Sequence, residues 1–172
     1  MKNRFIHPSA VIEPGAKLAN NVTIGPFSYI GADVTLHSRV EIKSHVVITG
    51  KTEIEQETVV YPFAVIGEIP QDLKFNGEKT SLKIGKRNQI RENVTINVGT
   101  AGGGGQTSVG NNCLFMTGSH IAHDAKIGDN VIIANCGAVA GHCVIEDDVI
   151  IGGLSGIHQF VRIGRGAIIG AV

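Results

Sequence analysis

Aliphatic residues return at every sixth position along most of this 172-residue chain. A first run has eleven members without a miss, and after an interruption a second run has eleven more. The first run is Ile6, Ile12, Leu18, Ile24, Ile30, Leu36, Ile42, Ile48, Ile54, Val60 and Ile66, and Ile84, Ile90 and Ile96 continue its pattern. The second run is Val109, Phe115, Ile121, Ile127, Ile133, Val139, Ile145, Ile151, Ile157, Ile163 and Ile169.

This period excludes an α-helix, because six residues carry a helix to the opposite face of its cylinder. Short strands joined by tight turns fit it, with the aliphatic side chain pointing inward and glycine or asparagine adopting positive φ in the turn. Hexapeptide repeats are typical of parallel β-helices, in which three hexads make one triangular coil and stacked coils share a core. An ordinary β-sandwich does not explain two such runs. We predict an all-β chain that forms a single parallel β-helix over residues 1–172.

Two segments interrupt the period. In the first, polar residues occupy the inward positions and Pro70 cannot donate to a strand ladder. In the second, residues 101–105 are almost entirely glycine. The glycine run lacks the lysine of a phosphate-binding P-loop and no helix pattern follows it, so it does not favour phosphate binding. We predict loops at about 67–83 and 97–108.

Histidines concentrate between residues 118 and 159, where four of the seven occur. Residues eighteen apart stack in neighbouring coils, about 4.8 Å apart. His123, Gly141 and Gln159 have this spacing and should form one column on an edge of the prism. Asp124 and His142 should form the next column.

His120, at the end of the previous hexad, should lie around the corner from His123. A lone histidine is usually a solvated turn residue, which is our interpretation of His7, His37 and His45. A cluster of imidazoles beside a carboxylate instead favours an acid–base site.

Covalent catalysis is not favoured. Ser119 and Cys143 fall at inward positions of the repeat and should be buried, so neither is placed as a nucleophile. A histidine base acting on a bound hydroxyl is the simpler hypothesis, with the backbone N–H of Gly141 receiving an oxyanion.

The composition narrows the function further. Fifteen basic and fifteen acidic side chains cancel, so there is no strong field for nucleic acid or an anionic membrane. There is no apolar run long enough to span a membrane, and residues 1–5 lead into no signal-peptide core. The three cysteines are odd in number and lack metal-ligand spacing, which indicates reduced thiols. We expect a cytoplasmic protein.

Five segments together resemble one family. They are Pro-Gln-Asp-Leu-Lys at 70–74, Ile-Arg-Glu-Asn-Val-Thr at 90–95, His-Ile-Ala-His-Asp at 120–124, Ala-Gly-His at 140–142 and Ile-His-Gln-Phe at 157–160. In this order, and through the whole chain, they resemble the UDP-N-acetylglucosamine O-acyltransferase family. Hexads alone are shared by many sugar acyltransferases, whereas the 70–74 loop and the paired histidines are more particular.

The resemblance implies a left-handed β-helix, a homotrimer and active sites between subunits. It implies transfer of a 3-hydroxyacyl group from acyl carrier protein to the 3-hydroxyl of UDP-N-acetylglucosamine, the first step of lipid A biosynthesis, without a cofactor. It makes His123 the general base, Asp124 its support and the Gly141 N–H the oxyanion donor. The residues that it implies for substrate binding are Gln71, Asp72, Lys74, His120, His142, His158 and Gln159.

Three features of this sequence bear on the comparison with the family. Asn97 stands where better-known members carry histidine, and Ala171 lies near the position that limits acyl-chain length. The family continues into an α-helical C-terminal domain, whereas this sequence stops at Val172 within the repeat. We therefore expect a fragment of a longer protein.

Three alternatives stay open. A zinc enzyme similar to the γ-class carbonic anhydrases would use His120, His123 and His142 as ligands, although their spacing does not resemble that family's. The related N-acyltransferase of the same pathway is disfavoured by the loop around Asp72 and by a repeat that starts at once. An inactive, truncated β-helix module is the third.

Overall fold

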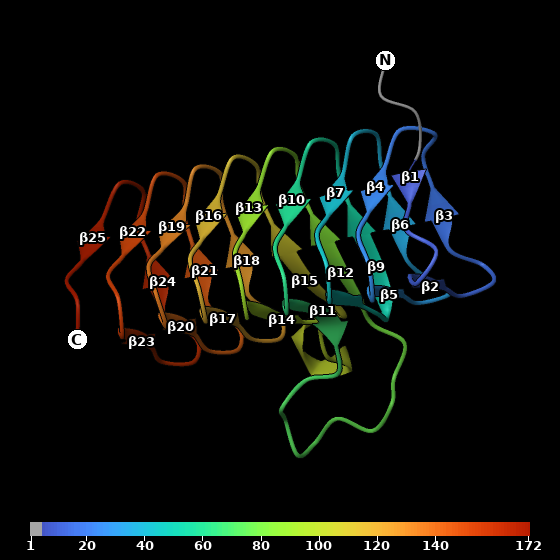
Figure 1. Cartoon of the computed structure of the whole chain (residues 1–172). Helices are drawn as coiled ribbons and strands as arrows, with labels where there is room; N and C mark the ends of the chain where they lie inside the picture. The colour runs from blue at the N-terminus through green and yellow to red at the C-terminus, as the bar shows by residue number, and fades with distance from the viewer. Residues whose placement is uncertain (1–4) are drawn as a thin grey trace.

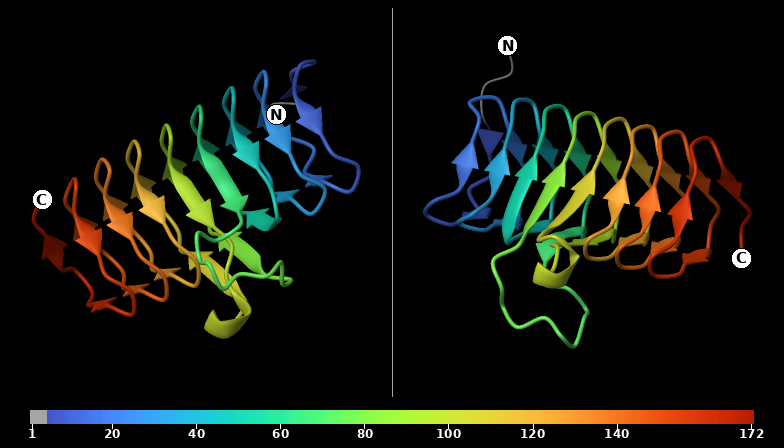
Figure 2. Two further views of the ribbon diagram at one scale, coloured as in Figure 1. Left: turned by 90° about the horizontal axis from the view of Figure 1, so that it is seen from below. Right: turned by 180° about the vertical axis from the view of Figure 1, so that it is seen from behind.

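The computed structural model describes residues 5–172 as a left-handed parallel β-helix with three flat faces (Figures 1 and 2). The fold predicted from the repeat is confirmed. Residues 1–4 lie outside the described residues. They belong to the segment in which the sequence predicts no signal peptide. Within residues 5–172 there is no helix of the length and apolarity that crossing a membrane requires.

The strands belong to three parallel sheets, one on each face of the prism. The first sheet consists of β1 (Phe5–Ile6), β4 (Thr23–Ile24), β7 (Glu41–Ile42), β10 (Val59–Val60), β13 (Gln89–Ile90), β16 (Leu114–Phe115), β19 (Ile132–Ile133), β22 (Ile150–Ile151) and β25 (Ile168–Ile169). The second sheet consists of β2 (Val11–Ile12), β5 (Tyr29–Ile30), β8 (Val47–Ile48), β11 (Val65–Glu68), β14 (Thr95–Asn97), β17 (His120–Ile121), β20 (Ala138–Val139) and β23 (Gly156–Ile157). The third sheet consists of β3 (Lys17–Leu18), β6 (Thr35–Leu36), β9 (Lys51–Ile54), β12 (Ser81–Ile84), β15 (Gln106–Val109), β18 (Lys126–Ile127), β21 (Val144–Ile145) and β24 (Arg162–Ile163).

The register follows the hexad count. Ile6 pairs with Ile24, and Ile133 pairs with Ile151, each partner eighteen residues away. The last residue of most two-residue strands points inward and is buried, whereas the residue before it faces outward, because successive strand side chains alternate. The core is therefore one continuous column of Ile, Val and Leu side chains.

The turns hold larger residues than the sequence pattern led us to expect. Many positive-φ positions are occupied by residues other than glycine or asparagine, including Phe27 (57°), Asp124 (60°) and His142 (63°). Such conformations are uncommon for bulky residues and carry backbone strain. At the corners of the prism they stack side chains of successive coils, as where His45 lies between Phe27 and Phe63 with centroid distances of 5.1 Å.

Both predicted loops exist, but they are shorter than the sequence indicated. Strand β11 continues to Glu68 and β12 begins at Ser81, so the first loop is 69–80 rather than 67–83. Strand β14 ends at Asn97 and β15 begins at Gln106, so the second is 98–105 rather than 97–108. The strands extend further because Leu82 and Thr107 fill inward positions, at 1% and 0% exposure.

The two loops leave the prism on the same side and meet there (Figure 1). The N–H of Ala101 donates to Glu78 Oε1 at 3.2 Å. Within the second loop, Ala101–Gly103 form a short 3₁₀ helix, η1, for which Thr100 is the N-cap. Both loops therefore lie at the corner between the second and third sheets, where the predicted column of His123 begins.

The cysteines are free thiols in two environments. Cys113 and Cys143 are buried, as expected for Cys143, and their thiols contact the carbonyls of Gly128 at 3.2 Å and His158 at 3.0 Å. Burial raises the pKa of the Cys113 thiol to about 12 and also raises the pKa of Cys143. Cys136 is exposed at a turn.

Candidate active site

A hollow opens on the outer face of the second sheet, where the outward side chains become small. The outward ladder runs from Thr95 to His120, then to Ala138 and Gly156 in the next two coils. Because alanine and glycine leave the sheet surface bare, a hollow of about 440 Å³ forms over them. Its lining consists of Gln71, Asn97, His120, Ala122, His123, Ala138, Ala140, Gly141, Gly156, Ile157 and His158.

The hollow brings together most of the residues singled out from the sequence. Gln71, His120, His123, Gly141 and His158 all line it, although they come from three coils and a loop. The predicted stacking is confirmed, since the N–H groups of the next residues, His142 and Phe160, donate to the carbonyls of His123 and Gly141.

His123 is the most enclosed of these histidines. The sequence placed it in a turn, and its backbone is there, but its side chain is not a free surface group: the residue is only 6% exposed. Its ring lies against Gly141, and Asp72 Oδ2 from the first loop is 3.9 Å from its Nε2. The other ring nitrogen, Nδ1, lies 2.8 Å from Asp124 Oδ2.

Asp124 is buried, at 3% exposure, and its carboxylate has three partners. Thr100 donates twice, from its backbone N–H to Oδ1 at 2.9 Å and from Oγ1 to Oδ2 at 2.6 Å, and His123 is the third partner. Burial alone would raise the pKa of this carboxyl group. The hydrogen bonds from Thr100 and His123 outweigh it and hold the pKa below its ordinary value.

This bonding selects one form of the His123 ring. The Thr100 N–H can only donate, and Thr100 Oγ1 accepts from the Gly103 N–H at 3.2 Å, so its own proton is directed to Asp124. Asp124 is then an ionised acceptor, and the proton of a neutral His123 ring belongs on Nδ1. Nε2 is left unprotonated at the hollow, which is the form that a general base requires.

Gly141 contributes space and a hydrogen-bond donor. A Cβ built on it would be 2.6 Å from Cε1 and 2.7 Å from Nε2 of His123, so only glycine lets the ring occupy its position. In the described part of the chain, the Gly141 N–H donates to no backbone carbonyl. It is therefore available to a ligand in the hollow beside the histidine base.

His120 occupies the floor of the hollow in a different state. Its Nδ1 is 2.7 Å from Thr95 Oγ1. Burial, with a smaller contribution from nearby His123, lowers the pKa of His120 below its ordinary value, so the ring is held neutral. A neutral ring can donate to a ligand from one nitrogen or accept at the other.

His142 lies behind the base rather than in the lining of the hollow. Its Nδ1 is 3.7 Å from Asp124 Oδ2, and its ring is stacked on Phe160 with a centroid distance of 4.5 Å. It also meets the His123 ring edge-on at 4.9 Å. This packing restricts the orientation of the His123 ring.

Asp72, Asp124 and His142 lie next to His123 without lining the hollow, and three further predicted residues lie outside it. Lys74 is exposed on the first loop, where its backbone N–H donates to Asp72 Oδ1 at 3.0 Å. Gln159 is exposed and does not line the hollow. Ala171 is exposed beside Gly152 in the last coil, and it too lies outside the lining.

Two residues matter more than the sequence indicated. Asn97 is 4% exposed, and its Nδ2 donates to the carbonyls of Glu68 and Ile69, which fixes the start of the first loop over the hollow. Thr100 was not predicted at all. Threonine is a favoured helix N-cap residue, but the glycine run after it predicts no helix, and only the structure places Thr100 against Asp124.

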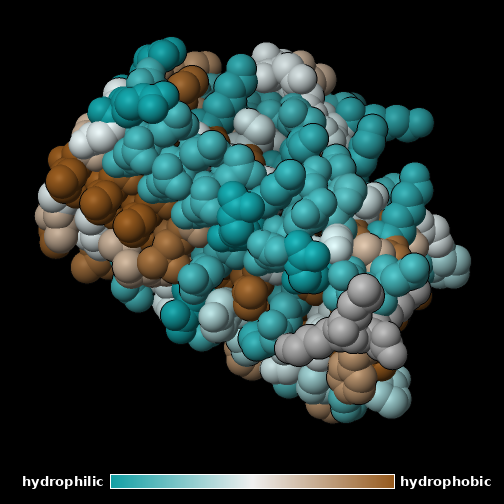
Figure 3. All heavy atoms as spheres, turned by 90° about the horizontal axis from the view of Figure 1, so that it is seen from above, coloured by the Kyte–Doolittle hydropathy of each residue, from teal (hydrophilic) through white to brown (hydrophobic). Residues whose placement is uncertain are grey.

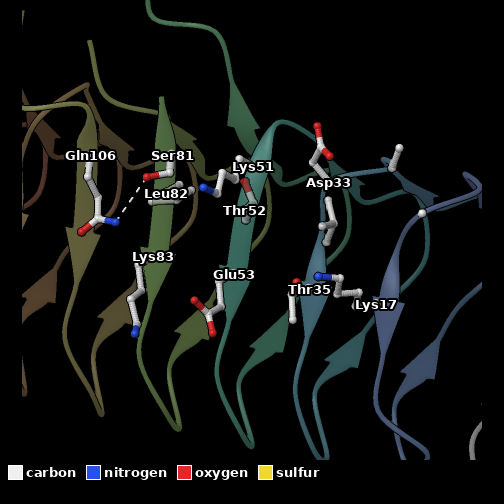
Figure 4. A pocket seen from close by; sticks show the side chains of 13 residues that line it. Lys17, Asp33, Thr35, Lys51, Thr52, Glu53, Ser81, Leu82, Lys83 and Gln106 are labelled. Carbon is white, nitrogen blue, oxygen red and sulfur yellow. Dashed lines mark hydrogen bonds between the residues drawn. The ribbon is translucent and has the colours of Figure 1, made fainter. Parts of the chain in front are cut away.

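A second hollow, of about 430 Å³, lies on the outer face of the third sheet (Figure 4). Its charged side chains mix both signs, since Lys17, Lys51 and Lys83 share the face with Asp33 and Glu53. Of the described residues that line it, none is a histidine. Of these two hollows, the one on the second sheet is therefore the one lined by imidazole groups.

The metal alternative is not favoured by the geometry. A zinc site of the predicted kind needs three converging imidazoles. Among residues 5–172, the ligand cluster at this site is His123, Asp124 and His142, without His120. The two hydrogen bonds from Thr100 already explain why Asp124 is ionised, so its charge does not require a metal ion. A second cluster, His37 with Glu53 and Glu55, contains the His37–Glu53 hydrogen bond of 2.8 Å.

Known proteins share the repeat and the whole fold. The model of the bacterial transferase hexapeptide family (six repeats) matches residues 15–50 and 106–141. An acyl-[acyl-carrier-protein]–UDP-N-acetylglucosamine O-acyltransferase of Rhizobium johnstonii is 50% identical over 97% of this chain and 61% of its own length. The chain spans about three fifths of the length of the curated relatives that it matches from end to end.

Solved structures agree with these relatives. LpxA from Acinetobacter baumannii superimposes with a TM-score of 0.96 and 46% identity over 97% of this chain and 65% of the other. The UDP-N-acetylglucosamine acyltransferase of Francisella novicida gives 0.91 and 37%, over 98% of this chain and 67% of the other. With the repeat, the fold and this identity in common along nearly its entire length, the chain belongs to the UDP-N-acetylglucosamine O-acyltransferase family.

Proposed function

We propose that this protein transfers a 3-hydroxyacyl group from acyl carrier protein to the 3-hydroxyl of UDP-N-acetylglucosamine, the first step of lipid A biosynthesis. The observation that carries the proposal is the His123 ring, which is bonded through Nδ1 to an ionised Asp124 and has Nε2 beside the available N–H of Gly141. The names of the relatives, which are O-acyltransferases of acyl carrier protein and UDP-N-acetylglucosamine, support the same reaction.

In this mechanism, Nε2 of His123 removes the proton of the sugar hydroxyl as its oxygen attacks the thioester carbonyl. The carbonyl oxygen becomes an oxyanion and accepts a hydrogen bond from the Gly141 N–H. The tetrahedral intermediate then collapses: the carbon–sulfur bond breaks, and His123 returns the proton to the thiolate of the carrier. Asp124 stabilises the imidazolium that forms between the two proton transfers.

The lining of the hollow suits these substrates. Ala122, Ala138 and Ala140 give an apolar floor for an acyl chain, and His120, His158 and Gln71 offer hydrogen-bonding groups around it. We assign substrate binding to these three residues and to Asp72, His142, Lys74 and Gln159. The last two would act from the rim, since both are exposed. Ala171 is the proposed position that influences acyl-chain length.

We further propose that the protein works in the cytoplasm as a homotrimer with the hollow between subunits. Apolar side chains that an isolated prism would leave in water support this. Val11 (52% exposed) and Tyr29 (36%) lie on the second sheet, Ile168 (72%) lies on the first, and Leu73 in the first loop is fully exposed. Figure 3 shows hydrophobic side chains gathered toward the C-terminal end of the molecule, at the left. Such patches mark interaction surfaces.

A turnover assay tests the reaction. Purified protein is mixed with UDP-N-acetylglucosamine, or its 3-amino analogue, and a series of 3-hydroxyacyl carrier proteins of different chain length. We expect ester formation with the hydroxyl acceptor, and a preferred chain length. His123→Ala should reduce turnover by roughly 100-fold or more, which is the scale of a general base. The matched control is His37→Ala, because His37 pairs with Glu53 away from the hollow and should retain activity.

Protein folding must be monitored alongside, because His123 is enclosed rather than free in solvent. Circular dichroism and thermal unfolding of both variants provide that check. A folded His123→Ala protein with near-normal turnover would contradict the mechanism. Stoichiometric zinc in the purified protein, with activity lost on its removal, would favour the metal alternative.

A further inference from the structure

The glycine-rich loop 98–105 covers the buried side of Asp124. Thr100 supplies two of the three hydrogen bonds to the carboxylate, and it is itself only 7% exposed. Thr100 is fixed in turn, because it caps η1, and its Oγ1 and carbonyl oxygen accept from the Gly103 N–H at 3.2 Å and 3.1 Å. The loop is therefore built around the contact between Thr100 and Asp124.

Gly103 is a position where the loop passes too close to the acid to leave room for a side chain. A Cβ built there would lie 1.9 Å from Asp124 Cγ and 2.2–2.3 Å from its two oxygens. In contrast, a Cβ at the neighbouring Gly102 would have no atom within 4 Å. The glycine run therefore has one position, Gly103, where Asp124 leaves no room for a side chain, and another, Gly102, where a side chain would meet nothing. The need for glycine at position 103 comes from the contact with Asp124 and not from a need for a flexible backbone.

The remaining contacts of Asp124 fix its backbone. Its own N–H donates to Thr107 Oγ1 at 2.8 Å, and Thr107 is fully buried in β15, directly after the loop. Asp124 is therefore held on three sides, by the loop that precedes β15, by β15 itself and by His123. On the side away from the loop, Asp124 Oδ2 lies 2.8 Å from Nδ1 of His123, and Nδ1 of His142 is farther away at 3.7 Å.

We propose that Thr100 and Gly103 are positioning residues for the acyl transfer, and that together they hold Asp124 so that His123 carries its proton on Nδ1. This inference rests on the proposed function for its catalytic consequence, but its structural content, the tautomer of one ring, does not. Neither residue needs to touch substrate. Their effect reaches the reaction through Asp124 and His123, and it gives the glycine run a role other than phosphate binding.

The kinetic test uses two matched pairs. Thr100→Val removes the hydroxyl but keeps the shape and the backbone N–H, and Thr100→Ser restores the hydroxyl. We expect kcat to fall by roughly 10- to 100-fold in the valine variant, as for the loss of a hydrogen bond to a charged group. KM for both substrates should stay within about twofold, because the substitution alters the contact with Asp124 and not a group that binds substrate. The serine variant should recover most of the rate.

The second pair uses glycines of the same turn. Gly103→Ala should reduce kcat as Thr100→Val does, because the added methyl group displaces Asp124, whereas Gly102→Ala should not. Thr58→Val is the control for loss of a buried threonine. Thr58 Oγ1 also donates to a carbonyl, that of Gly85, and accepts an N–H, that of Asn88, but in coils away from the hollow.

The spectroscopic test does not need turnover. Nitrogen NMR of histidine-labelled protein reports which ring nitrogen is protonated, and His123→Gln identifies the signals of that ring. Asp72, His120 and His142 also lie near the ring, so spectra of the variants are compared at the same pH as those of the unaltered protein. We expect Nδ1–H in the unaltered protein, and mixed tautomers in Thr100→Val and Gly103→Ala.

The outcomes separate the two proposals. Protein that never forms ester but has the expected tautomer defeats the proposed function and leaves the inference intact. Folded Thr100→Val and Gly103→Ala proteins that keep the Nδ1–H tautomer, or keep full kcat, overturn the inference. If Thr100→Val does not fold, Gly103→Ala decides alone, since Gly103 is half-exposed in η1 and the three atoms nearest to an added methyl group all belong to Asp124.

Discussion

The contact between Gly141 and the His123 ring shows how narrowly one residue sets the chemistry of this site. The ring lies where a Cβ of residue 141 would be, so any larger residue must displace it. The His142 ring also meets it at 4.9 Å, and Phe160 stacks on His142. The His123 ring is therefore restrained both by the missing side chain at position 141 and by the neighbouring stack of rings.

We predict that Gly141→Ala lowers kcat by about 100-fold, the scale of a displacement of roughly 1 Å at a reacting group. The substitution keeps the backbone N–H, so the loss would arise from the displaced ring rather than from a lost oxyanion donor. The measurement is kcat with saturating substrates, with thermal unfolding in parallel. Gly164→Ala is the control, because a Cβ there would contact nothing within 4 Å. Unchanged kcat in Gly141→Ala would show that the ring has room to move.

At the scale of the strand, the hexad repeat determines where nearly every strand and every core residue lies, and its exceptions are informative. Counting in sixes located the core and the stacked columns, because every coil obeys one register. It misjudged the ends of both loops because the four-residue strands β12 and β15 have an extra inward position, filled by Leu82 and Thr107. The count of six does not mark these positions, because each falls two residues before the next residue of the repeat, and Thr107 is also polar.

Residues of the candidate site could be predicted from the sequence where the register of the repeat determines their positions. His123 and Gly141 follow from the spacing of eighteen, since stacked coils bring them together, and His120 follows from its place in the hexad before His123. The contact of Thr100 with Asp124 does not follow, because it depends on how an irregular loop folds back over the corner. The enclosure of His123 was missed for the same reason, as the covering Asp72 comes from the other loop.

Adjacent residues of one strand offer a test of the inward–outward alternation. Ile145 in β21 is 1% exposed, whereas Val144 next to it faces outward and is half-buried. We predict that Ile145→Ala lowers the free energy of unfolding by about 2–5 kcal/mol, because it leaves a cavity in the continuous core. Val144→Ala should cost less than about 1 kcal/mol. Urea denaturation measures both, and equal losses would contradict the alternation.

At the scale of the whole molecule, the three faces differ in what they expose. The outer face of the third sheet carries mixed charges, including Lys17, Glu53 and Lys83. The second sheet instead exposes Val11 and Tyr29, together with the hollow. One face is therefore suited to water and the other to a neighbouring surface, which is the physical basis for the proposed trimer.

We predict that the protein sediments as a trimer at micromolar concentration. Paired substitutions Val11→Glu and Tyr29→Glu should shift it toward monomer, because they place charges in an apolar contact. Thr35→Glu on the third sheet should not, since that face is already charged. Analytical ultracentrifugation distinguishes these states. Monomeric unaltered protein would contradict the proposal, and a trimer unaffected by the paired change would place the interface elsewhere.

The two buried thiols can report local opening of the β-helix. An alkylating reagent reacts with the thiolate, and neither Cys113 nor Cys143 can form one readily while its coil is closed. Because each coil of a solenoid contacts only its neighbours, opening can be local. The rates at which these two thiols are lost, measured against exposed Cys136, would therefore record separately how often two different coils of one molecule come apart.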